Sequence, residues 1–309
     1  MKITHFSAVR ERGSALLMVF WLMAILTLFL FTTIQLVSSD VNLVVSQKHD
    51  FRANQLCEMG LAIAANPQVQ RYDPILTRFD TLADEGYSVR IKGEGGKINI
   101  NLLLQQNDRE FLERIFTFWG LELEQAEELS DCLIDWIDPD DETNISGAEN
   151  EYYFEAGFPT YPFNRPFYDL QEMALVKGMD YLNLVKPNWR SFFTLFSGGK
   201  LDLRDADQES IMMVAEVSDF AAEDFITVRR GADGIEGTED DAQFESLSAA
   251  LSELGLDEGS PQANRLTVND ETTRIESVGR VGDYQKMIVL VLRNRESNPV
   301  ILNREEIYN

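Results

Sequence analysis

A long uncharged segment near the N-terminus limits what this chain can fold into. Residues 14–39 contain no Asp, Glu, Lys or Arg over 26 positions, and most of them are apolar. Because a helix rises about 1.5 Å per residue, the segment exceeds the ~20 residues needed to cross a bilayer. It is also longer than the apolar core of a secretory signal peptide, about 7–15 residues, and no small-x-small cleavage site closes it. We therefore predict one membrane-spanning helix.

The flanks of this segment indicate its orientation. The first 13 residues carry Lys2, Arg10 and Arg12 against a single acid, Glu11. Basic flanks stay on the cytoplasmic side of a membrane. The body of the chain is therefore expected outside the cytoplasm.

Helical character continues beyond the expected membrane span. Apolar residues recur at steps of three, four and seven as far as Ile63, and Pro67 ends the pattern. One helix over residues 14–65 would be about 75 Å long, with its first half in lipid and its second half packed on a globular head. Cys57 lies on the second half and is expected to be a packed thiol. A disulfide with Cys132 is the alternative, although we expect the two cysteines in different subdomains.

Charge and residue types exclude several classes of function. The net charge is −25, from 52 acidic and 27 basic residues, so the surface repels phosphate backbones and no nucleic-acid partner is expected. His5 and His49 are the only histidines, which leaves little for His-dependent catalysis. A membrane-anchored hydrolase is opposed by the absence of G-x-S-x-G and H-E-x-x-H motifs. We expect a protein that is not an enzyme.

The rest of the chain alternates strand and helix patterns. Strands are predicted at 87–92, 97–101, 265–268, 273–281 and 284–293, and helices at 108–119, 122–137 and 169–176. The continuous apolar run from Met287 to Leu292 is typical of a central, buried strand. This order predicts an α+β fold, in which a long N-terminal helix packs on an antiparallel sheet and a large α-helical domain is inserted between strands.

An acidic region within the insertion suggests a bound cation. Residues 115–164 contain thirteen Asp and Glu and no Lys or Arg. Residues 138–149 place oxygen-bearing side chains at positions one, three, five, seven, nine and twelve of an EF-hand calcium loop. These residues are Asp138, Asp140, Glu142, Asn144, Ser146 and Glu149. Because Thr143 replaces the glycine of position six and no exiting helix is obvious, we predict an oxygen-lined calcium loop and not a complete EF-hand. An acidic surface loop is the alternative.

A second acidic loop spans residues 229–241. Its glycines let the backbone curl so that oxygen ligands converge. The candidate ligands are Asp233, Glu236, Asp240 and Asp241. A second calcium site and a hairpin tip are equally supported interpretations.

Two parts of the sequence resemble known secretion proteins. Arg12-Gly13, directly before the apolar run, resembles the class III leader of type IV pilins and type II secretion pseudopilins. The segment LIDWIDPDDETNISGAENEYY at 133–153, the Asn164-Arg165-Pro166 element and the segment 169–178 resemble minor pseudopilin K of type II secretion. Leu203 and Asp205 depart from the family pattern in the strand after the insertion, which indicates a divergent member.

The resemblance implies a processing site, a location and partners. A prepilin peptidase would cut between Gly13 and Ser14, and Ser14 would be methylated. The mature protein would be a single-pass protein of the bacterial inner membrane, with its body in the periplasm. It would cap or initiate the tip of the pseudopilus that exports folded proteins across the outer membrane. Implied partners are the I-, J- and H-type minor pseudopilins and the major pseudopilin.

The resemblance also divides the chain into segments. These are the leader at 1–13, the transmembrane part of the stem at 14–39, the periplasmic stem and first strands at 40–101, the inserted α-helical domain at 102–200 and the remainder of the pilin-like domain at 201–309. A type IV pilus minor pilin or a calcium-dependent membrane-anchored adhesin is the alternative, and neither accounts for the large helical insertion.

The fifth residue counted from Ser14 is Met18. Pilin-like proteins mostly carry a Glu there, which neutralises the N-terminal ammonium of the adjacent subunit. An unpaired carboxylate in hydrocarbon costs at least a few kcal/mol. An apolar Met18 therefore suits a subunit with nothing above it, and predicts a protein that caps the assembly.

Overall fold

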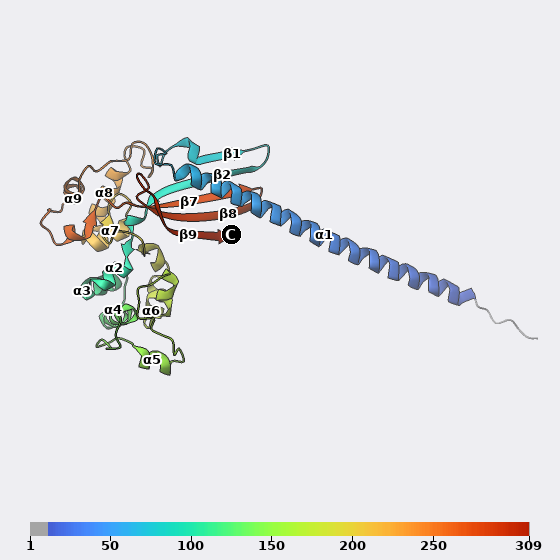
Figure 1. The fold of residues 1–309 in the computed structure, drawn as a ribbon, viewed down its shortest axis with the longest axis horizontal. Coiled ribbons are helices and arrows are strands. Elements are labelled where there is room, and N and C mark those ends of the chain that lie inside the picture. Colours follow the sequence, from blue (N-terminus) through green and yellow to red (C-terminus); the bar gives the residue numbers. More distant parts are fainter. Residues whose placement is uncertain (1–11, 309) are drawn as a thin grey trace, which may run out of the picture.

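The computed structural model describes residues 12–308, and its side chains from Leu16 to Ile307. Helix α1 (Arg12–Ala64) is 53 residues and about 80 Å long, and it projects from the body as a rod (Figure 1). Residues 16–48 are exposed along this rod. Within α1, the stretch that begins at Leu16 is long and apolar enough to cross a membrane. The predicted leader at residues 1–13 lies almost wholly outside the described residues.

The second half of α1 packs on one face of a five-stranded antiparallel sheet with the order β1-β2-β7-β8-β9. The strands are β1 (Thr77–Asp80), β2 (Glu85–Gly93), β7 (Thr272–Val281), β8 (Tyr284–Arg293) and β9 (Val300–Tyr308). Alternate residues of β2, such as Val89 and Ile91, are buried under α1 with Leu56 and Leu61. As predicted, β8 is a central strand, between β7 and β9.

Two glycines allow α1 to approach the sheet closely. A Cβ added at Gly279 of β7 would lie 2.1 Å from the carbonyl oxygen of Ala53, and one added at Gly60 of α1 would lie 2.4 Å from Ser277 Oγ. Next to this contact, the buried Cys57 thiol accepts a hydrogen bond from the Gly279 amide and donates one to the Lys286 carbonyl. Cys57 and Cys132 are both free and lie in different hydrophobic cores, as the sequence led us to expect.

A second body occupies the chain between β2 and β7. Its helices are α2 (Ile100–Gln105), α3 (Arg109–Phe118), α4 (Leu123–Ile137), α5 (Asn150–Glu155), α6 (Met179–Val185), α7 (Gln208–Ala215), α8 (Asp219–Arg229) and α9 (Leu247–Glu253). Two short parallel pairs join β3 (Ile98–Asn99) to β4 (Phe193–Thr194) and β5 (Leu201–Asp202) to β6 (Leu266–Thr267). In Figure 1 this body lies at the end of the sheet farthest from the exposed half of α1.

The core of the second body extends farther along the chain than the sequence indicated. One hydrophobic cluster runs from Ile98 to Val268 and includes Trp136, Trp189 and Phe225. The predicted boundary between residues 200 and 201 therefore falls inside a single core. The predicted strand at 97–101 is only Ile98–Asn99, because the Asn99 side chain accepts a hydrogen bond from the Leu102 amide and begins α2. The predicted helix at 169–176 is the 3-10 helix Leu170–Leu175.

Candidate metal centre

Helix α4 carries two buried aspartates, Asp131 and Asp135, one turn apart. Buried carboxylates need hydrogen-bond donors or cations, and the following loop supplies donors. The amide of Ser146 donates to Asp131 Oδ2 at 2.9 Å, and the amide of Ala148 donates to Asp135 Oδ2 at 2.8 Å. The side-chain amide of Asn144 also donates to Asp135. These bonds hold the loop at 138–149 against the last turns of α4.

Three carboxylates converge where this loop meets α4. Oxygens of Asp135, Asp138 and Glu149 all lie within 4.8 Å of one another. Glu149 is only 3% exposed, and both of its carboxylate oxygens, with Oδ1 of Asp138, are buried and accept no hydrogen bond from the described residues. None of the ion pairs formed among residues 16–307 involves these three side chains.

The concentration of negative charge changes the acidity of the cluster. Burial, reinforced by Asp135 and Asp138, raises the pKa of Glu149 to about 8. Burial, with repulsion from Asp140 and Asp135, raises the pKa of Asp138 to about 6. Burial also raises the pKa of Asp135, although its hydrogen bonds from Asn144 and Ala148 oppose the change. Without a cation, the site favours protonated carboxyls.

A glycine keeps space open next to the cluster. A Cβ added at Gly147 would lie 1.9 Å from Asp135 Oδ2. Any other residue there would displace the Asp135 carboxylate or the loop. The site therefore combines unpartnered buried oxygens with a backbone that leaves room beside them.

The structure brings together only some of the predicted loop ligands. Asp138 and Glu149 converge, whereas Asp140 and Glu142 are exposed, and Asp140 Oδ1 accepts a hydrogen bond from the Glu142 amide. Asn144 and Ser146 hold the loop on α4 through Asp135 and Asp131.

Asp135 as a candidate ligand and helix α5 as the exit of the loop were not predicted from the sequence. Asp135 precedes Asp138 by three residues at the end of a helical pattern, and that spacing places two side chains on one face. Asp135 lies outside the twelve positions of an EF-hand loop that starts at Asp138, so the loop pattern does not include it. The loop at 138–149 does run from one helix to the next, from α4 to α5.

The four predicted ligands of the second loop do not gather into a cluster within the described part of the chain. Their carboxylates bind the loop's own backbone and a neighbouring cation. Asp240 Oδ2 accepts from the amides of Ala232 and Asp233, and Asp241 Oδ2 accepts from that of Gly237. Asp233 Oδ1 accepts from the amide of Ile235, and Glu236 lies 3.6 Å from Arg229. This geometry is that of a self-capped turn.

The donor set of the first cluster limits which ion it could hold. The three converging side chains offer only oxygen, without His nitrogen or Cys sulfur. Hard divalent cations such as calcium prefer carboxylate and carbonyl oxygens, whereas zinc sites usually include nitrogen or sulfur. The residues present therefore fit calcium.

Comparisons with known proteins agree on one family. A family model described as type II secretion system protein K matches residues 96–185. The type II secretion system protein K of Klebsiella pneumoniae is 31% identical over 91 residues, which is 26% of this chain and 28% of that protein. The chain thus matches well under half the length of this curated relative.

A solved structure has the same fold over most of the chain. A chain of the GspK–GspI–GspJ complex from the enterotoxigenic Escherichia coli type 2 secretion system superposes with a TM-score of 0.63 and 14% identity. The superposition covers 87% of this chain and 99% of that one. The region at 96–185, which contains the three-carboxylate cluster, is therefore similar to type II secretion system protein K, and the rest of the chain shares the fold of the solved structure.

Proposed function

We propose that this chain is a minor pseudopilin of a type II secretion system, a structural component and not an enzyme. The observation that carries the proposal is the insertion of the protein K domain into a stem-and-sheet scaffold. Helix α1 anchors the protein in the inner membrane, and the basic N-terminal flank keeps the body in the periplasm. A type IV pilus minor pilin or an adhesin would not account for this inserted domain.

The shape of the molecule supports a position at the tip of the pseudopilus. The second body extends from the end of the sheet that points away from the membrane span (Figure 1). In a helical fibre a subunit stacked above would meet this body. Met18 is apolar and 74% exposed on α1, so it offers no carboxylate to a subunit above.

The partners follow from this position. The similar structure assembles protein K with GspI and GspJ. We infer that this chain binds I- and J-type minor pseudopilins, joins the H-type and major pseudopilins through them, and is processed by a prepilin peptidase between Gly13 and Ser14.

Calcium would stabilise the inserted domain. Asp135, Asp138 and Glu149 would hold the ion, which would supply the positive charge that residues 115–164 lack. Because Asp135 belongs to α4 and Glu149 precedes α5, the ion would join the two ends of the loop.

A secretion assay tests the proposed function. In the host strain, deletion of the gene should abolish release of type II substrates into the medium, and the plasmid-borne chain should restore it. Affinity purification of the tagged chain from detergent-solubilised membranes should recover I- and J-type pseudopilins. Normal secretion by the deletion strain, or recovery of type IV pilus subunits instead, would contradict the proposal.

A further inference from the structure

The sheet face opposite α1, called here the open face, is positively charged in a strongly acidic protein. Strand registers place five cations and two carboxylates on it. The cations are Arg90, Lys92, Arg274, Arg280 and Arg293, and the carboxylates are Glu276 and Glu305. The open face therefore carries a net charge of about +3, the difference of these two counts, while the whole chain carries −25.

Two of these cations are available to a ligand. Arg90 and Lys92 are exposed, and neither side chain makes a hydrogen bond or ion pair with another residue of the described chain. The nearby Glu276 is already engaged, because Arg274 Nε donates to its Oε1 at 2.8 Å. Burial alone would raise the pKa of Glu276, but that hydrogen bond and the charges of Arg274, Arg90 and Lys92 lower it.

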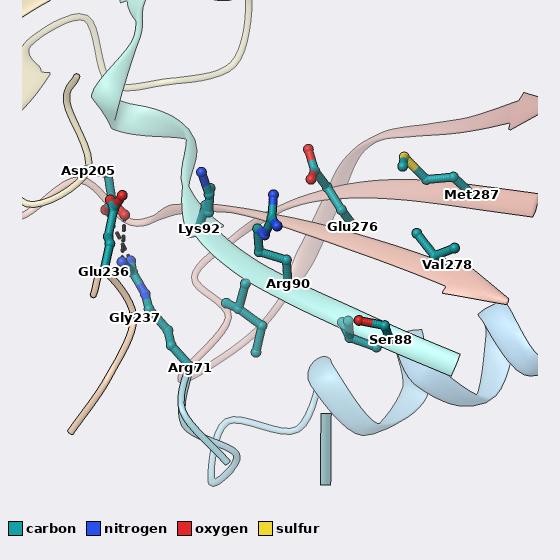
Figure 2. A pocket seen from close by; sticks show the side chains of 12 residues that line it. Arg71, Ser88, Arg90, Lys92, Asp205, Glu236, Gly237, Glu276, Val278 and Met287 are labelled. Atoms are coloured by element: carbon teal, nitrogen blue, oxygen red, sulfur yellow. Dashed lines mark hydrogen bonds and ion pairs between the residues drawn. The ribbon is translucent and has the colours of Figure 1, made fainter. Parts of the chain in front are cut away.

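The free cations line a pocket of about 550 Å³ (Figure 2). Figure 2 shows Arg90, Lys92 and Glu276 extending from the sheet away from α1. At one end of the pocket, the ion pair of Arg71 with Asp205 and the loop at Glu236 form a wall. Val278 and Met287 lie at the other end and offer apolar surface.

The pocket continues toward the second body. A neighbouring pocket of about 640 Å³ shares Glu276 with it. Its charged lining residues are the cations Lys97, Arg190, Arg274 and Arg304 and the carboxylates Glu94, Asp169, Glu276 and Glu305. The resulting trough runs from the sheet to the inserted domain, so it could hold an extended chain and not only a small anion.

The position of the trough excludes a lipid headgroup as its occupant. Gly60 of α1 packs against Val89, the neighbour of Arg90. Gly60 lies 21 residues beyond Ser39, where the uncharged segment ends, so the trough is about 30 Å from the membrane surface along the stem. Electrostatic attraction to lipid falls off within about 10 Å.

The spacing of the cations indicates the shape of the ligand. Arg90 and Lys92 are two positions apart on β2, so their Cα atoms are separated by about 6.8 Å. Carboxylates at alternate positions of an extended peptide have the same spacing.

We propose that the open face is a docking site for an acidic, extended segment of a partner protein. Alternate carboxylates of that segment pair with Arg90 and Lys92, and an adjoining apolar side chain packs on Val278 and Met287. This docking site is inferred from the charge and shape of the open face, so it does not depend on the proposed pseudopilin function.

A binding measurement on the full-length chain in non-ionic detergent micelles tests this proposal. The probe is a fluorescein-labelled peptide in which glutamates alternate with valines, and its control has glutamine in place of glutamate. Fluorescence anisotropy should show binding of the glutamate peptide only, weakening as salt is added. Arg90→Gln/Lys92→Gln should reduce its affinity about tenfold, or about 1.4 kcal/mol.

Two further variants separate this site from general electrostatics. Arg78→Gln/Lys200→Gln removes the same charge from exposed positions off the open face and should change the affinity less than twofold. Arg90→Lys/Lys92→Arg keeps both charges and should bind nearly as the parent chain does. Equal binding by the parent and Arg90→Gln/Lys92→Gln, or by the two peptides, would overturn the proposal. The proposal would also fail if Arg90→Gln/Lys92→Gln changed only the self-association of the chain. The occupant of the open face would then be a second copy of this chain.

Discussion

At the scale of single residues, Glu149 and Asp138 make stability depend on pH. Their pKa values are raised to about 8 and about 6, from ordinary values of 4.5 and 3.8. Between the ordinary and raised values the folded state holds protons that the unfolded state has released. The free energy of unfolding therefore falls as pH rises through that interval.

We expect the melting temperature of the chain in chelator to fall between about pH 5 and about pH 8. Carboxylates whose pKa is lowered by ion pairs, such as Glu85 and Asp205, titrate below this range and do not mask the change. Excess calcium should remove the fall, because the ion binds the deprotonated carboxylates. Glu149→Gln should reduce it in chelator. A melting temperature that is constant or rises over this interval would be inconsistent with the cluster.

A second residue-scale prediction concerns the space beside Asp135. Gly147→Ala would place a methyl group 1.9 Å from Asp135 Oδ2 and displace the loop. We expect a loss of about 1–3 kcal/mol of stability and at least a tenfold weaker calcium affinity, measured by thermal melting and calorimetry. Gly259→Ala is the matched control, since a Cβ there meets nothing within 4 Å. Equal calcium binding by both variants would place the ion elsewhere.

At the scale of elements, the end of α1 depends on a residue far along the chain. Arg295 is buried, and its Nε donates to the Ala64 carbonyl at 2.8 Å. Its Nη2 donates to the carbonyls of Asn66 and Val69, both at 2.7 Å. A cation at a helix C-terminus satisfies free carbonyls and opposes the helix dipole. Arg295 thereby joins the β8–β9 connection to the end of the stem.

Arg295→Ala should lower the free energy of unfolding by about 1–3 kcal/mol, because it leaves buried carbonyls without donors. Urea unfolding in detergent followed by circular dichroism would measure the change. Arg78→Ala, which removes an exposed arginine from β1, should stay within about 0.5 kcal/mol of the parent. If both variants lost the same stability, Arg295 would not be acting as a cap.

At the scale of the whole molecule, the chain consists of a stem with a sheet and a second body at its far end (Figure 1). Immunogold labelling of pseudopili should show this protein at one end of the fibre. Regular labelling along the shaft would contradict the proposed tip position.

Two substitutions of Met18, in the apolar part of α1, also test the proposed position at the tip of the pseudopilus. Met18→Glu places a carboxylate in the apolar part of α1 at a cost of at least about 2.5 kcal/mol, and at the proposed tip position no subunit above would neutralise it. We expect it to reduce secretion, whereas Met18→Leu should leave secretion unchanged.

Features that depend on local pattern could be predicted from the amino-acid sequence. The uncharged run at 14–39 specifies a helix that is long and apolar enough to cross a membrane. Alternation in β2 and β7 specifies one buried face for each strand. Asp138 and Glu149, which converge in the structure, were predicted as ligands from their spacing within one loop. In each case the residues concerned are close in sequence, so their periodicity carries the information.

Features that depend on residues distant in sequence became visible only in the folded chain. Asp135 belongs to the carboxylate cluster because the loop folds back and donates to it from Asn144 and Ala148. The second body extends to Val268 because α7, α8 and α9, which were not predicted from the sequence, complete its core. The open face is positive because β2 and β7, which are almost 180 residues apart, bring Arg90 and Arg274 onto one surface. Such pairings are set by chain topology, which no local pattern records.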